Sequence, residues 1–247
     1  MAKHKVLSTK KLEPSLIEQA RGNDIEIVEQ EFISVQPIRN QETFARILDF
    51  INRKQLNIVL TSANAVDVLN SYMHVYDTYY VIDWNIFCLS GKTKEAVLNA
   101  LLLKKNIVAE ASNATDLANK IIEEGVREII FFCSDKRRDE LPNALKNANI
   151  KVHEVVLYIT TETPVVMNDD YDAILFFSPS GVQSFFSSNE LHQDTICFAI
   201  GRTTATSIAT FTNNKIIKSL SPDAKLMIEK VIDHFKNPIA DNYWQEL

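Results

Sequence analysis

The segment Leu60-Thr61-Ser62-Ala63-Asn64-Ala65-Val66 returns in altered form as Phe176-Phe177-Ser178-Pro179-Ser180-Gly181-Val182, with Ser62 and Ser178 116 residues apart. In both copies an apolar run ends in hydroxyl side chains, and the spacing of apolar residues then changes to that of a helix. Such a change is typical of a buried strand that leads through a tight turn into a helix. Two copies predict two similar lobes in one chain.

Two more pairs of segments recur in the same order. Ser90-Gly91-Lys92-Thr93 corresponds to Ile200-Gly201-Arg202-Thr203, and Asn113-Ala114 corresponds to Asp223-Ala224, each at a separation of 110 residues. Each segment stands where an apolar run gives way to a helical pattern. The ordered set is more specific than any one pair, so it indicates a duplicated domain.

Strand-like and helical patterns alternate along the chain. The predicted strands are rich in β-branched and aromatic residues: Lys5–Ser8, Ile25–Glu29, Asn57–Leu60, Ile86–Leu89, Ile107–Ala109, Glu128–Cys133, Val152–Leu157, Ala173–Phe177, Ile196–Ile200 and Lys215–Ile217. The predicted helices lie between them: Pro14–Arg21, Gln41–Arg53, Ala63–Met73, Lys92–Leu102, Ala114–Glu124, Arg138–Asn147, Pro179–Ser187, Thr203–Phe211 and Pro222–Phe235. Because the strand segments are continuously apolar, they are expected to be parallel and covered on both faces. The alternation predicts the α/β class.

Two stretches interrupt this alternation. Glu31–Asn40 contains Pro37, and Tyr158–Asn168 has no helical period, so linkers are predicted at about 34–38 and 158–164. The segment 38–157 is then a domain inserted into a discontinuous domain made of 1–35 and 164–247. The repeated turns of the two domains are expected to face one another across a ligand cleft.

The overall composition argues against several classes of protein. The net charge of −6 over 247 residues does not suit a general nucleic-acid binder, which needs a basic surplus. The chain has five glycines, whereas an average usage of about 7% would give about seventeen. Neither a G-x-G-x-x-G nor a P-loop pattern occurs, so dinucleotide-binding and P-loop folds lose their main support.

The three cysteines and five histidines do not form a metal-binding pattern. Cys88, Cys133 and Cys197 each lie in an apolar strand-like run, which indicates buried, reduced thiols of a cytoplasmic protein. Their spacing does not fit a zinc site, and the histidines are scattered, so no metal is expected. No apolar run approaches the roughly 18 residues of a membrane span, and no signal peptide is evident.

The repeated turns have the chemistry of an anion site. In parallel sheets the helix that follows a strand presents unpaired N–H groups and a partial positive charge at the ligand-binding edge. Gly91 and Gly201 would let a ligand approach the backbone. Hydroxyl donors surround these positions, namely Ser62, Thr93, Ser178, Ser180, Thr203 and Thr204. Carboxylates suit this arrangement, although each residue taken alone is more typical of an ordinary helix cap.

Basic residues and one tyrosine add to this edge. Lys10-Lys11 follows the first predicted strand, and Lys136-Arg137-Arg138 stands at a predicted helix start, where the helix dipole disfavours cations. The second cluster therefore suggests an anion nearby, while a solvated surface is the alternative for both. Tyr158, at the start of the second linker, is expected to reach the cleft with its phenol. A packed tyrosine with its hydroxyl in water is the alternative.

Five ordered motifs over nearly the whole chain resemble the uroporphyrinogen-III synthase family. They are Val59-Leu60-Thr61-Ser62-Ala63-Asn64-Ala65-Val66, Gly91-Lys92-Thr93, Leu157-Tyr158-Ile159-Thr160, Phe177-Ser178-Pro179-Ser180-Gly181-Val182 and Ile200-Gly201-Arg202-Thr203-Thr204-Ala205. The resemblance implies two flavodoxin-like parallel-sheet domains joined by a two-stranded linker, with neither a metal nor an organic cofactor. It implies a cyclising lyase of haem biosynthesis whose substrate is hydroxymethylbilane, a linear tetrapyrrole with eight carboxylates.

The implied reaction expels the terminal hydroxyl as water, inverts the D ring through a spiro intermediate and closes the macrocycle to uroporphyrinogen III. Tyr158 would hydrogen-bond or protonate the leaving hydroxyl. The substrate would be held by Lys10, Thr61, Ser62, Asn64, Gly91, Thr93, Ser134, Ser178, Ser180, Gly201, Thr203 and Thr204. The resemblance further suggests a monomer in transient contact with the enzyme that makes hydroxymethylbilane, with no nucleic-acid or membrane partner.

The sequence departs from the family pattern at three positions. Lys10 stands where an arginine is usual, and a lysine keeps the charge but loses the bidentate fork. Ser134 and Asn149 stand where glycines are expected, and asparagine tolerates the left-handed backbone that a glycine supplies.

Two other functions are compatible with a two-lobed α/β chain. A non-catalytic tetrapyrrole-binding or regulatory protein would share the same cleft and differ in turnover alone. An unrelated sugar-phosphate or nucleotide enzyme is disfavoured, because the glycine loops and acid–base clusters that such sites use are missing.

Overall fold

The computed structural model describes residues 2–53, 55–75, 82–100 and 106–237. Its internal contacts divide the chain into two compact units. Unit 1 comprises Met1–Ser34 and Thr161–Leu247, and unit 2 comprises Val35–Thr160.

Unit 2 is built on a six-stranded sheet in the order β3-β8-β7-β4-β5-β6. Its strands are β3 (Ile33–Pro37), β4 (Asn57–Leu60), β5 (Asn85–Leu89), β6 (Ile107–Ala111), β7 (Glu128–Ser134) and β8 (Lys151–Glu162), and its helices are α2 (Gln41–Ile51), α3 (Ala63–Val75), α4 (Lys92–Asn99), α5 (Ala114–Glu123) and α6 (Glu140–Asn147). All pairings among β4 to β8 are parallel.

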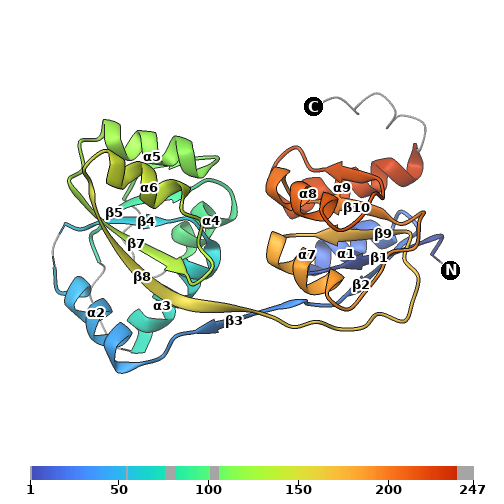
Figure 1. The fold of residues 1–247 in the computed structure, drawn as a ribbon, viewed down its shortest axis with the longest axis horizontal. Helices are drawn as coiled ribbons and strands as arrows, with labels where there is room; N and C mark the ends of the chain where they lie inside the picture. Colours follow the sequence, from blue (N-terminus) through green and yellow to red (C-terminus); the bar gives the residue numbers. More distant parts are fainter. Residues whose placement is uncertain (1, 54, 76–81, 101–105, 238–247) are drawn as a thin grey trace. The chain divides into compact units, whose positions relative to one another are not determined.

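Helices cover both faces of this sheet, as the continuously apolar strands require. Buried side chains of α2, α3 and α4, such as Ile47, Leu69 and Val97, form one core with the sheet. Leu117 of α5 and Leu145 of α6 belong to a second core on the opposite face, where these two helices lie side by side (Figure 1).

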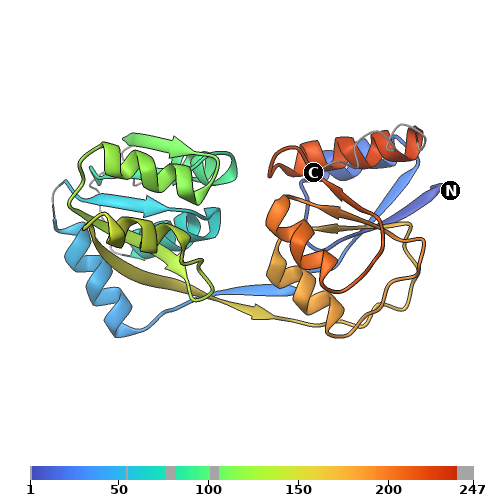
Figure 2. The ribbon, with the colours of Figure 1, turned by 45° about the horizontal axis from the view of Figure 1, so that its top comes forward.

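Unit 1 has a five-stranded parallel sheet in the order β11-β10-β9-β1-β2. Its strands are β1 (His4–Ser8), β2 (Ile25–Glu29), β9 (Ala173–Phe176), β10 (Ile196–Ala199) and β11 (Ile216–Lys218), and its helices are α1 (Pro14–Arg21), α7 (Pro179–Phe186), α8 (Arg202–Ala209) and α9 (Ala224–Lys236). Helices α1 and α9, blue and red in Figure 2, pack on one face. Helices α7 and α8 pack on the other.

The two sheets share one topology. Strands β11, β10, β9, β1 and β2 of unit 1 correspond in order to β6, β5, β4, β7 and β8 of unit 2. The order in unit 1, read as 2-1-3-4-5, is that of flavodoxin-like sheets. The predicted α/β class with two parallel sheets is therefore confirmed, and the segment that begins the chain supplies the strands equivalent to β7 and β8.

The repeated segments occupy equivalent helix starts. Asn113 and Asp223 are the N-cap residues of α5 and α9, and each side chain accepts a hydrogen bond from the backbone N–H three residues on, at 2.9 and 3.0 Å. Gly91 and Gly201 precede α4 and α8. Gly91 has a φ of +70°, where a side chain is strained. Asn149, with a φ of 60°, occupies the left-handed backbone expected of it.

Several predicted element boundaries differ from the structure, and strand β3 (Ile33–Pro37) lies where a linker was predicted. Strand β8 continues to Glu162 through the start of the predicted linker, because a run of β-branched residues there extends the strand beside β3. Helix α6 begins at Glu140 rather than Arg138. Helix α4 ends at Asn99, and residues 101–102 of its predicted range lie outside the described residues.

The cysteines have the environment that the sequence predicts. Cys88, Cys133 and Cys197 are buried free thiols. Burial raises the pKa of the first two thiols to about 11 and that of Cys197 to about 12, so all three stay protonated near neutral pH. Within the described residues, no helix combines the length and the apolar character that crossing a bilayer requires.

Candidate functional site: the carboxyl edges of the two sheets

The carboxyl ends of β7, β4 and β5 lie together at one edge of unit 2. Leu60 at the end of β4 pairs with Phe132 on one side and with Cys88 on the other. Ser134 and Ser62 therefore follow adjacent strands at the point where the connection order of the sheet reverses. That switch point is where open parallel sheets bind ligands.

A β-bulge in β8 brings Tyr158 to this edge. Cys133 of β7 pairs with Val156, but Ser134 pairs with Tyr158, so Leu157 is an extra residue in the ladder. In a regular strand consecutive side chains point to opposite faces. Here Leu157 and Tyr158 belong to the same core, with exposed fractions of 0% and 5%. The bulge has redirected Tyr158, as bulges near functional sites often do.

The Tyr158 hydroxyl is hydrogen-bonded within the edge. It donates to Ser62 Oγ at 3.0 Å, and Asn64 N also donates to this oxygen, at 3.2 Å. Burial raises the pKa of the Tyr158 phenol, and hydrogen bonding with Ser62 and Ser134 offsets only part of this effect. The phenol therefore stays protonated over the neutral range and can donate a hydrogen bond.

Asp135 holds the backbone at Tyr158 and two residues beyond it, and no sequence motif pointed to this residue. Its N–H donates to Tyr158 O at 3.1 Å, and its carboxylate accepts from Thr160 N at 2.9 Å. These two bonds fix the bulged part of β8. The one sequence signal for Asp135 was its place directly after Ser134 at a strand end.

The corresponding edge of unit 1 also gathers hydroxyl groups. Ser178 is the N-cap of α7, and its Oγ accepts from Gly181 N at 3.1 Å. Thr9 Oγ1, after β1, donates to Leu175 O at 2.7 Å. A Cβ at Gly181 would lie 3.3 Å from Ser178 Oγ and 3.9 Å from Thr9 Oγ1, so glycine keeps this turn tightly packed. Lys10 follows directly and is exposed.

The structure places the remaining predicted binding residues at the same two edges, with different exposure. Thr93 of α4 and Thr204 of α8 are buried, at 6% and 2% exposure, which disfavours a direct ligand contact through their hydroxyls. Thr203 and Gly91 are exposed. Partly exposed positions are Thr61, Ser62, Asn64, Ser134, Ser178, Ser180 and Gly201.

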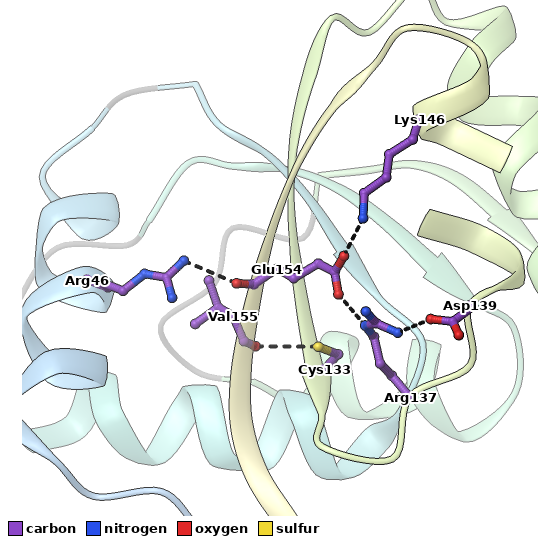
Figure 3. Close-up of polar contacts among 7 residues, drawn as sticks. All are labelled: Arg46, Cys133, Arg137, Asp139, Lys146, Glu154 and Val155. Carbon is purple, nitrogen blue, oxygen red and sulfur yellow. Dashed lines mark hydrogen bonds and ion pairs between the residues drawn. The ribbon is translucent and has the colours of Figure 1, made fainter. Parts of the chain in front are cut away.

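The basic cluster after Ser134 needs no external anion at Arg137. The Arg137 guanidinium pairs with Asp139 and with Glu154, and Lys146 Nζ lies 2.8 Å from the second oxygen of Glu154 (Figure 3). The anions beside Arg137 are thus two carboxylates of the protein itself. The cluster also precedes α6 rather than starting it, so the helix dipole does not act on it as expected.

The Glu154 cluster is expected to stabilise the fold above mildly acid pH. Burial alone raises the pKa of the Glu154 carboxyl, but the hydrogen bonds from Lys146 and Arg137 outweigh it and lower the pKa. A lowered folded-state pKa contributes stability above the unfolded pKa that is lost as pH falls through the folded value. Glu154→Gln should lower the free energy of unfolding at pH 7 by about 1–2 kcal/mol.

Urea unfolding at a series of pH values measures this effect. The difference between Glu154→Gln and the unmodified chain should shrink as the pH falls below the ordinary carboxyl pKa and through the lowered pKa of Glu154, where the folded protein takes up the proton. Glu123→Gln, on the exposed side of α5, is the matched control and should change stability by less than about 0.5 kcal/mol. An equal loss in both variants, or a difference that does not shrink as the pH falls, would contradict the assignment.

No metal-binding cluster was found in the described part of the chain, where no group of three or more His, Cys, Asp or Glu side chains gathers around one point. The chemistry available at both edges is that of hydroxyls, backbone N–H groups and helix N-termini. These groups bind carboxylates, and at Tyr158 a protonated phenol is added.

The chain is similar to several known proteins. A family model described as uroporphyrinogen-III synthase HemD matches residues 14–229. The uncharacterized protein RP474 of Rickettsia prowazekii (strain Madrid E) is 23% identical over 139 residues, which is 53% of this chain and 48% of that protein. The aligned part thus spans about half the length of this relative.

Two solved structures share the fold. A mutant uroporphyrinogen III synthase from the extremely thermophilic bacterium Thermus thermophilus has a TM-score of 0.62 and 13% identity, and covers 96% of this chain and 99% of its own. The uroporphyrinogen-III synthetase from Helicobacter pylori 26695 has a TM-score of 0.60 and 13% identity, with 93% and 99% covered. Because the family model extends over most of the sequence, from the first helix to the last, the chain belongs to the uroporphyrinogen-III synthase family.

Proposed function

We propose that this protein is an enzyme that converts hydroxymethylbilane to uroporphyrinogen III, with loss of water and inversion of the D ring through a spiro intermediate. It is then a cyclising hydro-lyase of haem biosynthesis. Membership in the family supports the activity. The observation that carries the chemistry is the hydrogen bond from the buried Tyr158 phenol to Ser62 at the switch point of unit 2.

In this reaction the protein forms no covalent bond with the substrate. The pyrrole electrons of the substrate expel the hydroxyl, so the enzyme has to supply a proton to the leaving group and to hold the chain for ring inversion. Closure without inversion competes spontaneously. To make closure with inversion a hundred times faster than spontaneous closure, the enzyme must stabilise its transition state by about 2.7 kcal/mol more. Positioning of the substrate by hydrogen bonds can provide this difference.

The substrate carboxylates are proposed to bind at the carboxyl edges of the two units. Exposed and partly exposed groups there would make direct contacts: Lys10, Thr61, Ser62, Asn64, Gly91, Ser134, Ser178, Ser180, Gly201 and Thr203. Thr93 and Thr204 would contribute through the helix starts that they help to form. A carboxylate at a helix N-terminus gains about 0.3–1 kcal/mol when exposed and up to about 2 when partly buried.

The remaining expectations are part of the same proposal. No metal or organic cofactor is required, since hydroxyl and backbone donors suffice for the chemistry. The protein is proposed to act in the cytoplasm as a monomer on a small-molecule substrate, in transient contact with the enzyme that makes it. The inserted segment 38–157 and the discontinuous pair 1–35 and 164–247 are proposed as its two domains.

The deciding experiment generates hydroxymethylbilane in situ and separates the uroporphyrinogen isomers formed with and without the protein. Isomer III is expected to dominate, at a rate well above spontaneous closure. Isomer I alone, formed at the rate of the protein-free control, would refute the activity. Tight tetrapyrrole binding without isomer III would instead indicate a non-catalytic binding protein.

Two adjacent threonines at the start of α8 should separate binding from stability. Thr203→Ala removes an exposed hydroxyl and should raise KM about three- to tenfold, equivalent to about 0.7–1.4 kcal/mol, with unfolding unchanged. Thr204→Ala removes a buried hydroxyl and should mainly lower the free energy of unfolding, by about 1 kcal/mol. Steady-state kinetics and urea unfolding measure both. Unchanged KM in Thr203→Ala would make this turn a helix cap alone.

A further inference from the structure

We propose that Ser62, and not Tyr158, presents the proton to the leaving hydroxyl of the substrate, and that Tyr158 acts through Ser62. This inference rests on the proposed synthase activity and assigns its proton path. It makes Ser62 the catalytic residue, whose one proton serves the leaving hydroxyl in place of the carboxylate contact proposed above, and Tyr158 the positioning residue that resupplies it.

Exposure distinguishes the two hydroxyl groups. Tyr158 is 5% exposed and packed in the same core as Leu157, and its hydroxyl donates to Ser62 and is also hydrogen-bonded with Ser134. Ser62 is partly exposed in the turn between β4 and α3. A ligand at the carboxyl edge therefore meets Ser62 before it can meet the phenol.

The hydrogen bonds of Ser62 leave its own proton for a ligand. A serine hydroxyl has one O–H donor and two acceptor sites. Both acceptor sites of Ser62 Oγ are occupied, by the Tyr158 hydroxyl at 3.0 Å and by Asn64 N at 3.2 Å. Two donors on the same oxygen also polarise its O–H bond, because chained hydrogen bonds strengthen one another.

The step balances in atoms and electrons. The C–O bond of the substrate breaks, its electron pair leaves with the oxygen, and the pyrrole nitrogen lone pair fills the vacant carbon orbital. The Ser62 proton moves to the departing hydroxyl, which leaves as water, while the Tyr158 proton moves to Ser62 Oγ. A concerted shift avoids a free serine alkoxide. One proton that the tetrapyrrole loses on ring closure returns to Tyr158, so the net product besides the macrocycle is one water.

The equivalent turn of unit 1 has the serine without the phenol. Ser178 Oγ accepts from Gly181 N, as Ser62 Oγ accepts from Asn64 N. Ser8, at the end of β1, pairs with Glu29 of β2. Ser134, at the equivalent end of β7, pairs with Tyr158 of β8. The Glu29 carboxylate accepts from Leu12 N. The repeat thus preserves the serine cap in both units, and unit 2 adds the phenol.

A double-mutant cycle tests the path. Ser62→Ala, Tyr158→Phe and the double variant are assayed for kcat, KM and isomer III formation, with Ser62→Thr as the variant that keeps a hydroxyl. Ser62→Gly removes the hydroxyl but keeps a favourable N-cap residue, in case Ser62→Ala fails to fold. Ser178→Ala and Ser178→Ala/Tyr158→Phe form the matched cycle at the equivalent serine of unit 1.

The expected pattern is non-additive. Ser62→Ala and Tyr158→Phe should each lower kcat about ten- to a hundredfold with KM changed less than about threefold, and the double variant should match the slower single variant within about threefold. Ser62→Thr should retain at least about a third of kcat. Effects of Ser178→Ala and Tyr158→Phe should instead multiply, because those side chains share no hydrogen bond.

Two outcomes would overturn the path. One is a kcat within about threefold of the unmodified chain in folded Ser62→Ala or Ser62→Gly, and the other is multiplication of the Ser62 and Tyr158 effects. If the unmodified protein still forms isomer III, either of these results refutes the proton path through Ser62 but leaves the proposed function standing. Isomer I alone from the unmodified protein refutes the proposed function, and the path with it.

Discussion

Tyr158→Phe is expected to lower kcat at least about tenfold, which corresponds to about 1.4 kcal/mol of transition-state stabilisation. The ring remains, so its packing beside Leu157 in the core of unit 2 is kept, and only the hydroxyl is lost. That hydroxyl is the donor to Ser62 at 3.0 Å. Removing it stops the proton supply while the turn that binds carboxylates stays intact. Steady-state kinetics with separation of the isomers measures the loss.

Tyr171→Phe is the matched control. Tyr171 is nearly as buried as Tyr158, at 7% exposure, and burial likewise raises the pKa of its phenol. It stands before β9, at the amino end of its sheet, and Lys5 lies over its ring. Loss of this hydroxyl should leave kcat within about twofold. Near-normal turnover in Tyr158→Phe, or an equal loss in Tyr171→Phe, would show that the Tyr158 hydroxyl has no special part in the reaction.

Phe132→Ala is expected to lower the free energy of unfolding by about 3–5 kcal/mol. Phe132 is fully buried in β7, its ring stacks on Trp84 with centroids 6.0 Å apart, and it meets Phe50 edge-on at 6.3 Å. Truncation leaves a cavity between a central strand and the helices of one face, where the surrounding packing relaxes only in part. Urea unfolding followed by circular dichroism measures the loss.

Leu98→Ala, in α4 of the same unit, is the control for this prediction. Leu98 is 37% exposed, and alanine is the best helix former, so the loss should stay below about 1 kcal/mol. A loss below about 2 kcal/mol in Phe132→Ala would mean that the core closes over the missing ring. Comparable losses in both variants would mean that burial does not decide stability in this unit.

Local signals were enough to predict most of the fold. Asn113 and Asp223 cap helices as their residue types favour, and the apolar segments around Val59 and Leu175 form central parallel strands. These features depend on neighbours a few residues away, so they can be read along the chain. The end of β8 at Glu162 could not be predicted from the local sequence. A β-branched segment becomes a strand or a linker according to whether another strand lies beside it.

The candidate site was predicted by residue type but not by geometry. Tyr158 and Ser62 were chosen separately, and nothing in the spacing of 96 residues indicated that their hydroxyls would meet. Asp135 was not chosen at all, although its two hydrogen bonds hold the bulged segment of β8. The basic cluster suggested an anion near Arg137, but its identity as Glu154, on a neighbouring strand, could not be predicted from the sequence.

The sequence by itself determined the α/β class, the two sheets of one topology and the polar turns at their carboxyl edges. It did so because strand and helix periods, caps and turns are local properties, and because the repeated segments carry them twice. Only the tertiary structure decided which hydroxyls lie within hydrogen-bonding distance of one another. A single extra residue in the β7–β8 ladder turns Tyr158 into the core and onto Ser62. Such a shift arises from the register between strands, which is set by long-range packing and not by the residues on either side.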